Sequence, residues 1–261
     1  MSTTTIPTAR RGAIGGDADR KTALVAGALY LVTFIGSIPA LPLYHDILRD
    51  RNHLLQGGSD TGVLWGALLE LTCALAGIGT AVVLYRVVKR HGPTRALGFV
   101  SARGFEAAMI AVGVVSVLAV VTLHQDAAGM SPAAASGLLS TARGLVAVHD
   151  WTFLVGPGLM PAVNALCLAT VLYRTRLVPR IIPLLGLIGA PLLVASSMAT
   201  LFGAWDQVSS AAALLALPIA AWEFSLGVWL VVKGFKPSPA ASDDTPALNV
   251  GFEPDQAPAL A

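Results

Sequence analysis

Six long apolar blocks constrain this chain more than any other feature. An α-helix rises about 1.5 Å per residue, so about 20 apolar residues cross the roughly 30 Å hydrocarbon core of a bilayer. Each block reaches that length with few charges inside it. The alternation typical of barrel strands is absent, and open sheet edges cannot persist in lipid, so strands are excluded as spans. The blocks cover residues 22–44, 61–85, 96–123, 145–173, 181–202 and 209–232.

The composition agrees with a membrane protein. Charged residues make up 12% of the 261 residues, whereas a soluble domain typically carries about 25%. The net charge of +2 is spread over short connecting segments, which leaves no basic face for nucleic acid. Cys73 and Cys167 both lie inside apolar blocks, so we interpret them as core residues and not as a disulfide or redox pair.

The distribution of Lys and Arg between the blocks predicts the orientation. If the spans alternate in direction, 13 of these residues fall on the side of the N-terminus and three on the other side, with Arg103 inside the third block. The excess of positive charge marks the cytoplasmic side, where both termini are then expected. An odd number of spans would break this alternation. The predicted fold is therefore an all-α, polytopic transmembrane helix bundle of about six spans, with a cytoplasmic N-terminus and C-terminus.

The chain divides into three predicted regions. Residues 1–20 form a polar cytoplasmic segment, and residues 21–236 form the six-helix transmembrane domain. The tail 237–261 is rich in Pro, Ala and Asp and is predicted to be disordered in the cytoplasm.

Six ionisable side chains within the blocks are unsuited to lipid. A charge at mid-bilayer costs at least about 2.5–3.5 kcal/mol on insertion scales, so these residues are expected to face the bundle interior or a water-filled cavity. Four acids stand against one Arg and one His, which leaves two acids to bind a proton or a cation. The alternative is a set of separate polar contacts that hold the helices together. The candidate cluster is Glu70, Arg103, Glu106, His149, Asp150 and Glu223.

The fourth block contains a candidate helix break. Gly156, Pro157, Gly158 and Pro161 lie near its middle. Pro removes a helix hydrogen bond and Gly weakens a helix, so a kink or break is expected at mid-membrane. Broken helices at the midplane border substrate sites in transporters, whereas a plain proline kink is the alternative interpretation.

Sequence signatures of catalysis are absent. The chain has no metalloprotease, nucleophile-elbow or phosphate-loop motif. We therefore assign no catalytic residue, no metal ligand and no cofactor. His124 follows the third block and is expected to be a solvated loop residue.

Five short segments resemble a known family. They are ALYLVTF at 28–34, GALLE at 66–70, RGFEA at 103–107, HDW at 149–151 and WEFSLG at 222–227. These segments resemble bacterial multi-pass membrane proteins catalogued as domain of unknown function 4386. The resemblance covers roughly residues 20–236 and implies a location in the bacterial cytoplasmic membrane, without an established activity.

Three functional interpretations follow. The sequence favours a structural or regulatory membrane protein without turnover, whose polar groups hold the bundle. The first alternative is a small transporter or ion-coupled permease that uses Glu70, Glu106, Asp150 and Glu223 around the helix break. The second is an intramembrane enzyme acting on lipid. The expected partners are the lipid bilayer and, for a permease, a proton, cation or small molecule. The sequence predicts no oligomeric state.

Overall fold

All regular elements in the described part of the chain are helices. The computed structural model describes residues 17–49, 59–131 and 133–236. Six helical segments there are long and apolar enough to cross a membrane, which confirms the predicted all-α fold with six spans. The helices are α1 (Asp17–Leu43), α2 (His45–Arg49), α3 (Thr61–His91), α4 (Pro93–Ala127), α5 (Ser136–Val155), α6 (Met160–Thr175), α7 (Ile181–Leu201) and α8 (Ser210–Val232).

Two of the predicted regions include residues outside the described part of the chain. Residues 1–16 of the polar N-terminal segment and the whole tail 237–261 lie outside the described residues. The cytoplasmic location of both termini stays a prediction, since the fold alone does not orient the bundle.

Several helices are longer than their apolar blocks. α4 has 35 residues, which corresponds to about 52 Å at 1.5 Å per residue, well beyond a hydrocarbon core of roughly 30 Å. α5 begins at Ser136, nine residues before the predicted block. Hydropathy marks where a helix meets lipid, whereas the helix itself continues into polar residues that are compatible with helical geometry.

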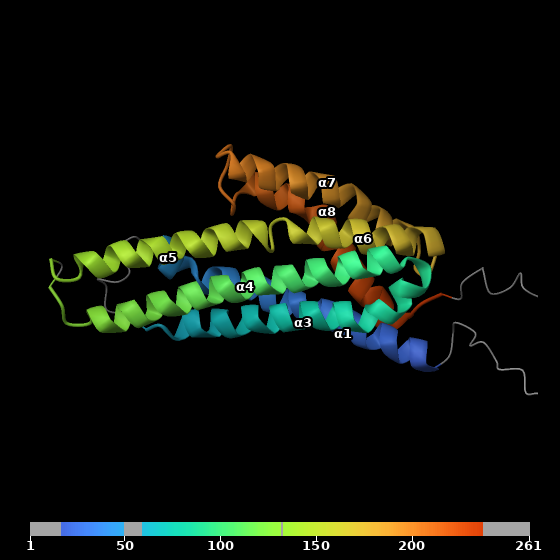
Figure 1. Cartoon of the computed structure of the whole chain (residues 1–261), viewed down its shortest axis with the longest axis horizontal. Coiled ribbons are helices and arrows are strands. Elements are labelled where there is room, and N and C mark those ends of the chain that lie inside the picture. Colours follow the sequence, from blue (N-terminus) through green and yellow to red (C-terminus); the bar gives the residue numbers. More distant parts are fainter. Residues whose placement is uncertain (1–16, 50–58, 132, 237–261) are drawn as a thin grey trace, which may run out of the picture.

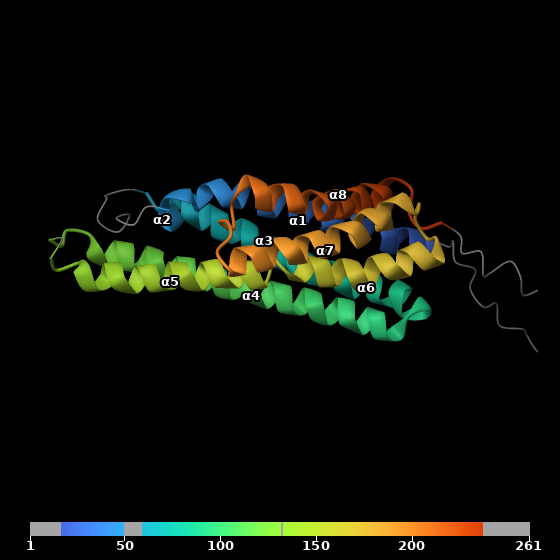
Figure 2. The ribbon, with the colours of Figure 1, turned by 90° about the horizontal axis from the view of Figure 1, so that it is seen from above.

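The six spans form a closed ring in chain order. α1 packs against α3, α3 against α4, α4 against both α5 and α6, α6 against α7, and α7 against α8. α8 closes the ring by packing on α1, and Figure 2 shows these two helices side by side. The start of α1 and the finish of α8 lie at one end of the bundle, and α2 lies toward the other (Figure 1 and Figure 2). We call the latter the α2 end.

Local sequence accounts for the tight turn between α3 and α4. The backbone N–H of Gly92 donates to the carbonyl of Val88 and completes the last turn of α3. Pro93 then begins α4, a position where proline loses nothing because the first N–H groups of a helix have no partner within that helix. The one-residue link makes the two helices an antiparallel pair.

Buried side chains form two clusters along the bundle. The larger one fills the half opposite the α2 end and includes Tyr30, Phe99, Leu172, Trp222 and Leu226. The smaller one lies at the α2 end and includes Tyr44, Ile47 of α2 and Val121. The outer surface is also apolar, as expected of helices in a bilayer. On α3, for example, the exposed residues are Leu64, Trp65, Leu68, Leu71, Leu75, Ile78 and Val82.

Candidate functional site

Arg103 on α4 is the centre of a buried ionic cluster. Its Nη1 donates to Oε2 of Glu106 at 3.1 Å, a pairing of residues three apart on the same helix. Its Nη2 donates to Oε1 of Glu223 on α8. The side chains of Arg103, Glu106 and Glu223 are 4%, 10% and 14% exposed. One guanidinium is thus shared by two carboxylates from different helices, inside the ring.

Asn164 on α6 is a fourth member that the sequence reasoning missed. Its Nδ2 donates to Oε2 of Glu106 at 2.7 Å, and the residue is 2% exposed. The predicted cluster contains ionisable side chains, whereas Asn164 is an uncharged amide in the apolar run after the proline break. The signal that could have found it is an amide in a span, which also needs a polar partner.

Two atoms of this cluster lack a partner within the described residues. They are Oδ1 of Asn164 and Nε of Arg103, both buried. A buried polar atom without a hydrogen bond costs about 1–3 kcal/mol, so these atoms are candidates for contact with water or a bound molecule.

Two aromatic rings also lie close to the guanidinium. The Cζ atom of Arg103 lies over the ring of Tyr30 on α1, 5.3 Å from its centroid, and 6.0 Å from the centroid of Phe99 on α4. Rings at this distance attract a cation through their negative faces. Arg103 is therefore held by groups from α1, α4 and α8.

Glu70 on α3 is a further buried carboxylate inside the ring. It is 9% exposed and lies next to Tyr44, whose ring also contacts the ring of His149. The Tyr44 ring packs on Gly66, where an added Cβ would lie 2.6 Å from the ring carbon Cε1. A small residue one turn before Glu70 thus admits the tyrosine beside the carboxylate.

These acids line a cavity of about 310 Å³ inside the ring, which we call the inner cavity. Glu70, Arg103, Glu106 and Glu223 are its charged lining residues. Its remaining wall is mostly apolar and comes from α1, the α5–α6 break, α7 and α8. Cavities of about 300–1,000 Å³ with a few converging polar groups are typical of small-molecule sites. The structure therefore brings four of the six predicted polar residues to one cavity.

The other two predicted residues lie nearer the α2 end. His149 is 5% exposed and Nδ1 of its ring is 3.3 Å from Oδ1 of Asp150, whose side chain is 59% exposed. Both line a second cavity of about 480 Å³, which we call the outer cavity, together with Arg49, Asp206 and Gln207. His149 also contacts the Tyr44 ring edge-on, with centroids 5.7 Å apart, so it connects the outer cavity to the neighbourhood of Glu70.

The fourth span is interrupted at the predicted position. α5 ends at Val155 and α6 begins at Met160. Because Pro157 has no N–H, the N–H of Gly158 donates instead to the carbonyl of Phe153, at 2.8 Å. The carbonyl of Gly158 accepts a hydrogen bond from Oγ of Ser197 on α7, at 2.7 Å. Pro157 and Pro161 line the inner cavity. The break thus borders the ionic cluster and is tied to α7.

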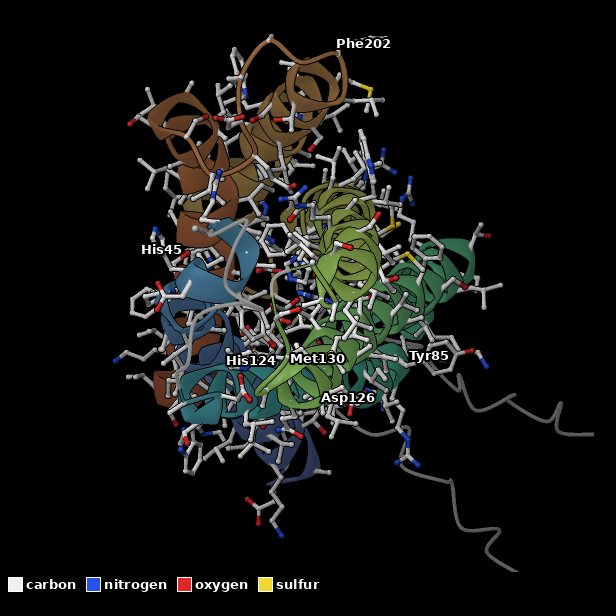
Figure 3. All side chains as sticks on the ribbon, turned by 90° about the vertical axis from the view of Figure 1, so that its left-hand side faces the viewer. His45, Tyr85, His124, Asp126, Met130 and Phe202 are labelled. Atoms are coloured by element: carbon white, nitrogen blue, oxygen red, sulfur yellow. The ribbon has the colours of Figure 1, made fainter. Side chains whose placement is uncertain are left out.

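His124 does not lie in a solvated loop, contrary to the expectation from sequence. It is 8% exposed within α4, and its Nδ1 is 2.8 Å from Oδ1 of Asp60, the residue that precedes α3. α4 continues to Ala127, so its last turn packs against the start of α3. Figure 3 shows His124, Asp126 and Met130 together at this end of α4.

In residues 17–49, 59–131 and 133–236, no three His, Cys, Asp or Glu side chains are grouped so that they could hold a metal ion. The groups around Arg103 form an ionic cluster beside the inner cavity. A site of this kind can bind and orient a small charged molecule.

A comparison with family models gives one match. The model described as a domain of unknown function, DUF4386, matches residues 25–234. The chain belongs to this family. The match to DUF4386 starts inside α1, ends just after α8 and contains every residue of the ionic cluster and of the helix break. No curated protein and no solved structure gives a significant match to the chain.

Proposed function

We propose that this DUF4386 protein is a small, cation-coupled permease whose binding site is the ionic cluster around Arg103. The observation that carries the proposal is the position of this cluster on the wall of a cavity large enough for a small molecule. The sequence alone favoured a structural role without turnover. The cavity now favours the permease.

The charges of the site support a cationic ligand. Arg103 is shared by Glu106 and Glu223, and Glu70 lines the same cavity. Buried charges are stable only when they are paired, and a carboxylate left over in a membrane interior is costly. A proton or a small cation in the cavity would complete the pairing.

The packing along the bundle supports access from one side. The large core cluster, with Trp222 and Leu226 on α8, fills the half of the ring opposite the α2 end. Toward the α2 end the inner and outer cavities have Leu41 and Phe153 as common wall residues. This arrangement matches one state of an alternating-access cycle, in which a midplane site faces a single side.

The structural alternative also rests on a specific observation. Arg103 connects α4 to α8, and Asn164 connects α6 to α4. Polar contacts between helices stabilise membrane bundles by about 0.6 kcal/mol on average. If the cluster serves this purpose alone, the cavity has no ligand.

Thermal unfolding of the purified protein separates the two functions. We would compare wild type, Glu223→Gln and Glu106→Gln against Na⁺, K⁺, tetramethylammonium and a series of pH values. The matched control is Asp150→Asn, which alters an exposed carboxylate at the outer cavity. A ligand at 100 times its Kd stabilises by about 2.7 kcal/mol. A permease predicts that a cation stabilises wild type and the control but neither Gln variant, and that it enters proteoliposomes.

The opposite result would support the structural role. In that case no cation or pH step shifts the unfolding of wild type, and both Gln variants unfold earlier than Asp150→Asn under every condition.

A further inference from the structure

The closest backbone contacts between α1 and α8 lie toward the start of α1 and the finish of α8, and the rings of Phe34 and Phe224 still meet further along, with centroids 5.5 Å apart. Nη1 and Nη2 of Arg20 donate to the carbonyls of Leu230 and Val231, at 3.0 and 2.7 Å. A Cβ on Gly27 would lie 2.6 Å from the carbonyl oxygen of Gly227, which shows how closely the backbones approach. The helices are therefore joined where α1 begins and α8 finishes.

Toward the α2 end, a cleft separates the same two helices. The inner cavity and a neighbouring cavity of about 270 Å³ both have Leu41 of α1 on one wall and Ala216 of α8 on another. Figure 1 shows the α7–α8 hairpin leaning away from α5 toward its tip, and Figure 3 shows Phe202 at that tip on the far side of the bundle from the end of α4. The tip of the hairpin thus diverges from α5.

This cleft opens sideways, toward the surface that meets lipid. Ile38 and Leu41 line the inner cavity and are 61% and 43% exposed. A side chain that both lines a cavity and is exposed lies at the edge of an opening. Because α1 and α8 are membrane spans, an opening between them lies beside hydrocarbon chains.

The chemistry of the cleft changes along its length. Its α1 and α8 walls are apolar, with Ile38 and Leu41 on α1 and Ala212 and Ala216 on α8. The neighbouring cavity also has the polar residues Thr200, Gln207 and Ser209 near the tip of the α7–α8 hairpin. Glu223 lies seven residues after Ala216, about 10 Å further along α8 at 1.5 Å per residue. There the wall becomes ionic, with Glu223 and Glu106 sharing one guanidinium.

We propose that the ligand is an amphipathic ammonium compound, with an apolar chain and a single amine, which enters from the membrane between α1 and α8. The chain occupies the apolar cleft, and the ammonium lies at Glu223. This inference rests on the proposed function and specifies its ligand. An anionic amphiphile would meet three carboxylates against one guanidinium, and a neutral one would not complete the pairing of the buried charges.

Octylamine is the probe that tests this ligand class. We would measure its effect on thermal unfolding of the protein in phosphatidylcholine nanodiscs, beside octanol (the same chain without charge) and tetramethylammonium (the same charge without a chain). We expect octylamine to stabilise wild type, octanol to have no effect, and Glu223→Gln to abolish the octylamine shift.

Variants of the cleft wall test the route. Ala216→Trp fills the cleft from α8, and Ile38→Trp fills it from α1 at an exposed position that tolerates a large side chain. The matched control is Leu214→Trp, which is 67% exposed on α8 and lines neither cavity of the cleft. We expect each cleft variant to weaken the apparent affinity for octylamine at least about tenfold, equivalent to 1.4 kcal/mol, and the control to behave as wild type.

Three results would overturn the inference: no octylamine shift in wild type, an equal shift with octanol, or cleft variants that bind octylamine like Leu214→Trp. The permease proposal has a separate outcome. It survives if tetramethylammonium or an inorganic cation still stabilises wild type but not Glu223→Gln, and it fails if no cation of any kind does so.

Discussion

Replacing Arg103 by Met should destabilise the protein by about 3–5 kcal/mol, the usual cost of removing one partner from a buried ion pair. The substitution leaves the carboxylates of Glu106 and Glu223 without their cation, at side-chain exposures of 10% and 14%. Met retains part of the packing against Tyr30 and Phe99, since its flexible thioether makes favourable contacts with aromatic rings. The loss therefore reports mainly on charge.

Unfolding in mixed micelles with increasing SDS would measure this loss. The control is Arg143→Met, which removes an exposed Arg on α5 and should change stability by no more than about 0.5 kcal/mol. A triple variant, Arg103→Met with Glu106→Gln and Glu223→Gln, removes every charge of the cluster and should recover most of the stability. Removing all members of a buried ionic set is often neutral or stabilising.

Two results would refute this reasoning. If Arg103→Met unfolds like Arg143→Met, the ion pairs do not hold the ring. If the triple variant is no more stable than Arg103→Met, uncompensated charge is not the cause of the loss.

Two further predictions concern packing and orientation. Gly27→Ala should destabilise by about 1–3 kcal/mol, the usual cost of overpacking, because its Cβ would collide with α8. Gly104→Ala, with no atom within 4 Å of its Cβ, should be neutral or stabilising by up to about 1 kcal/mol, and thermal unfolding compares the two. If the termini are cytoplasmic, a membrane-impermeant maleimide should label Met130→Cys on intact cells and Lys236→Cys only after permeabilisation, two positions that are both exposed. The reverse pattern would contradict the orientation, and equal Gly27→Ala and Gly104→Ala stabilities would contradict the close approach of α1 and α8.

The six spans could be predicted because a bilayer leaves the backbone few choices. Every peptide group in lipid must bond within its own helix, so length and hydropathy of a block suffice to identify a span. The same logic gives no information outside the hydrocarbon layer. That is why α5 begins at Ser136 and α4 includes His124, although hydropathy placed both segments in a loop.

The partners within the site could not be predicted to the same degree. A charge in a span reveals that it must avoid lipid, but not which helix it faces. Arg103 and Glu106 share a helix, and their spacing of three residues indicates a pair. The contact of Arg103 with Glu223, 120 residues away, depends on the ring closing between α8 and α1. Asn164 carries no charge and gave no comparable signal.

The ionic cluster offers a physical link between ligand binding and movement of the α7–α8 hairpin. Glu223 is on α8, and its partner Arg103 is on α4 across the ring. An ammonium at Glu223 would compete with this guanidinium and weaken the connection between the two helices. A ligand that binds one of two pre-existing arrangements of a protein more tightly shifts the equilibrium toward that arrangement. The size of the shift is set by the difference between its affinities for the two. Ser197 of the same hairpin donates to the carbonyl of Gly158, where the backbone hydrogen bonds of α5 and α6 are already interrupted, so a change in the position of the hairpin would also reach this break.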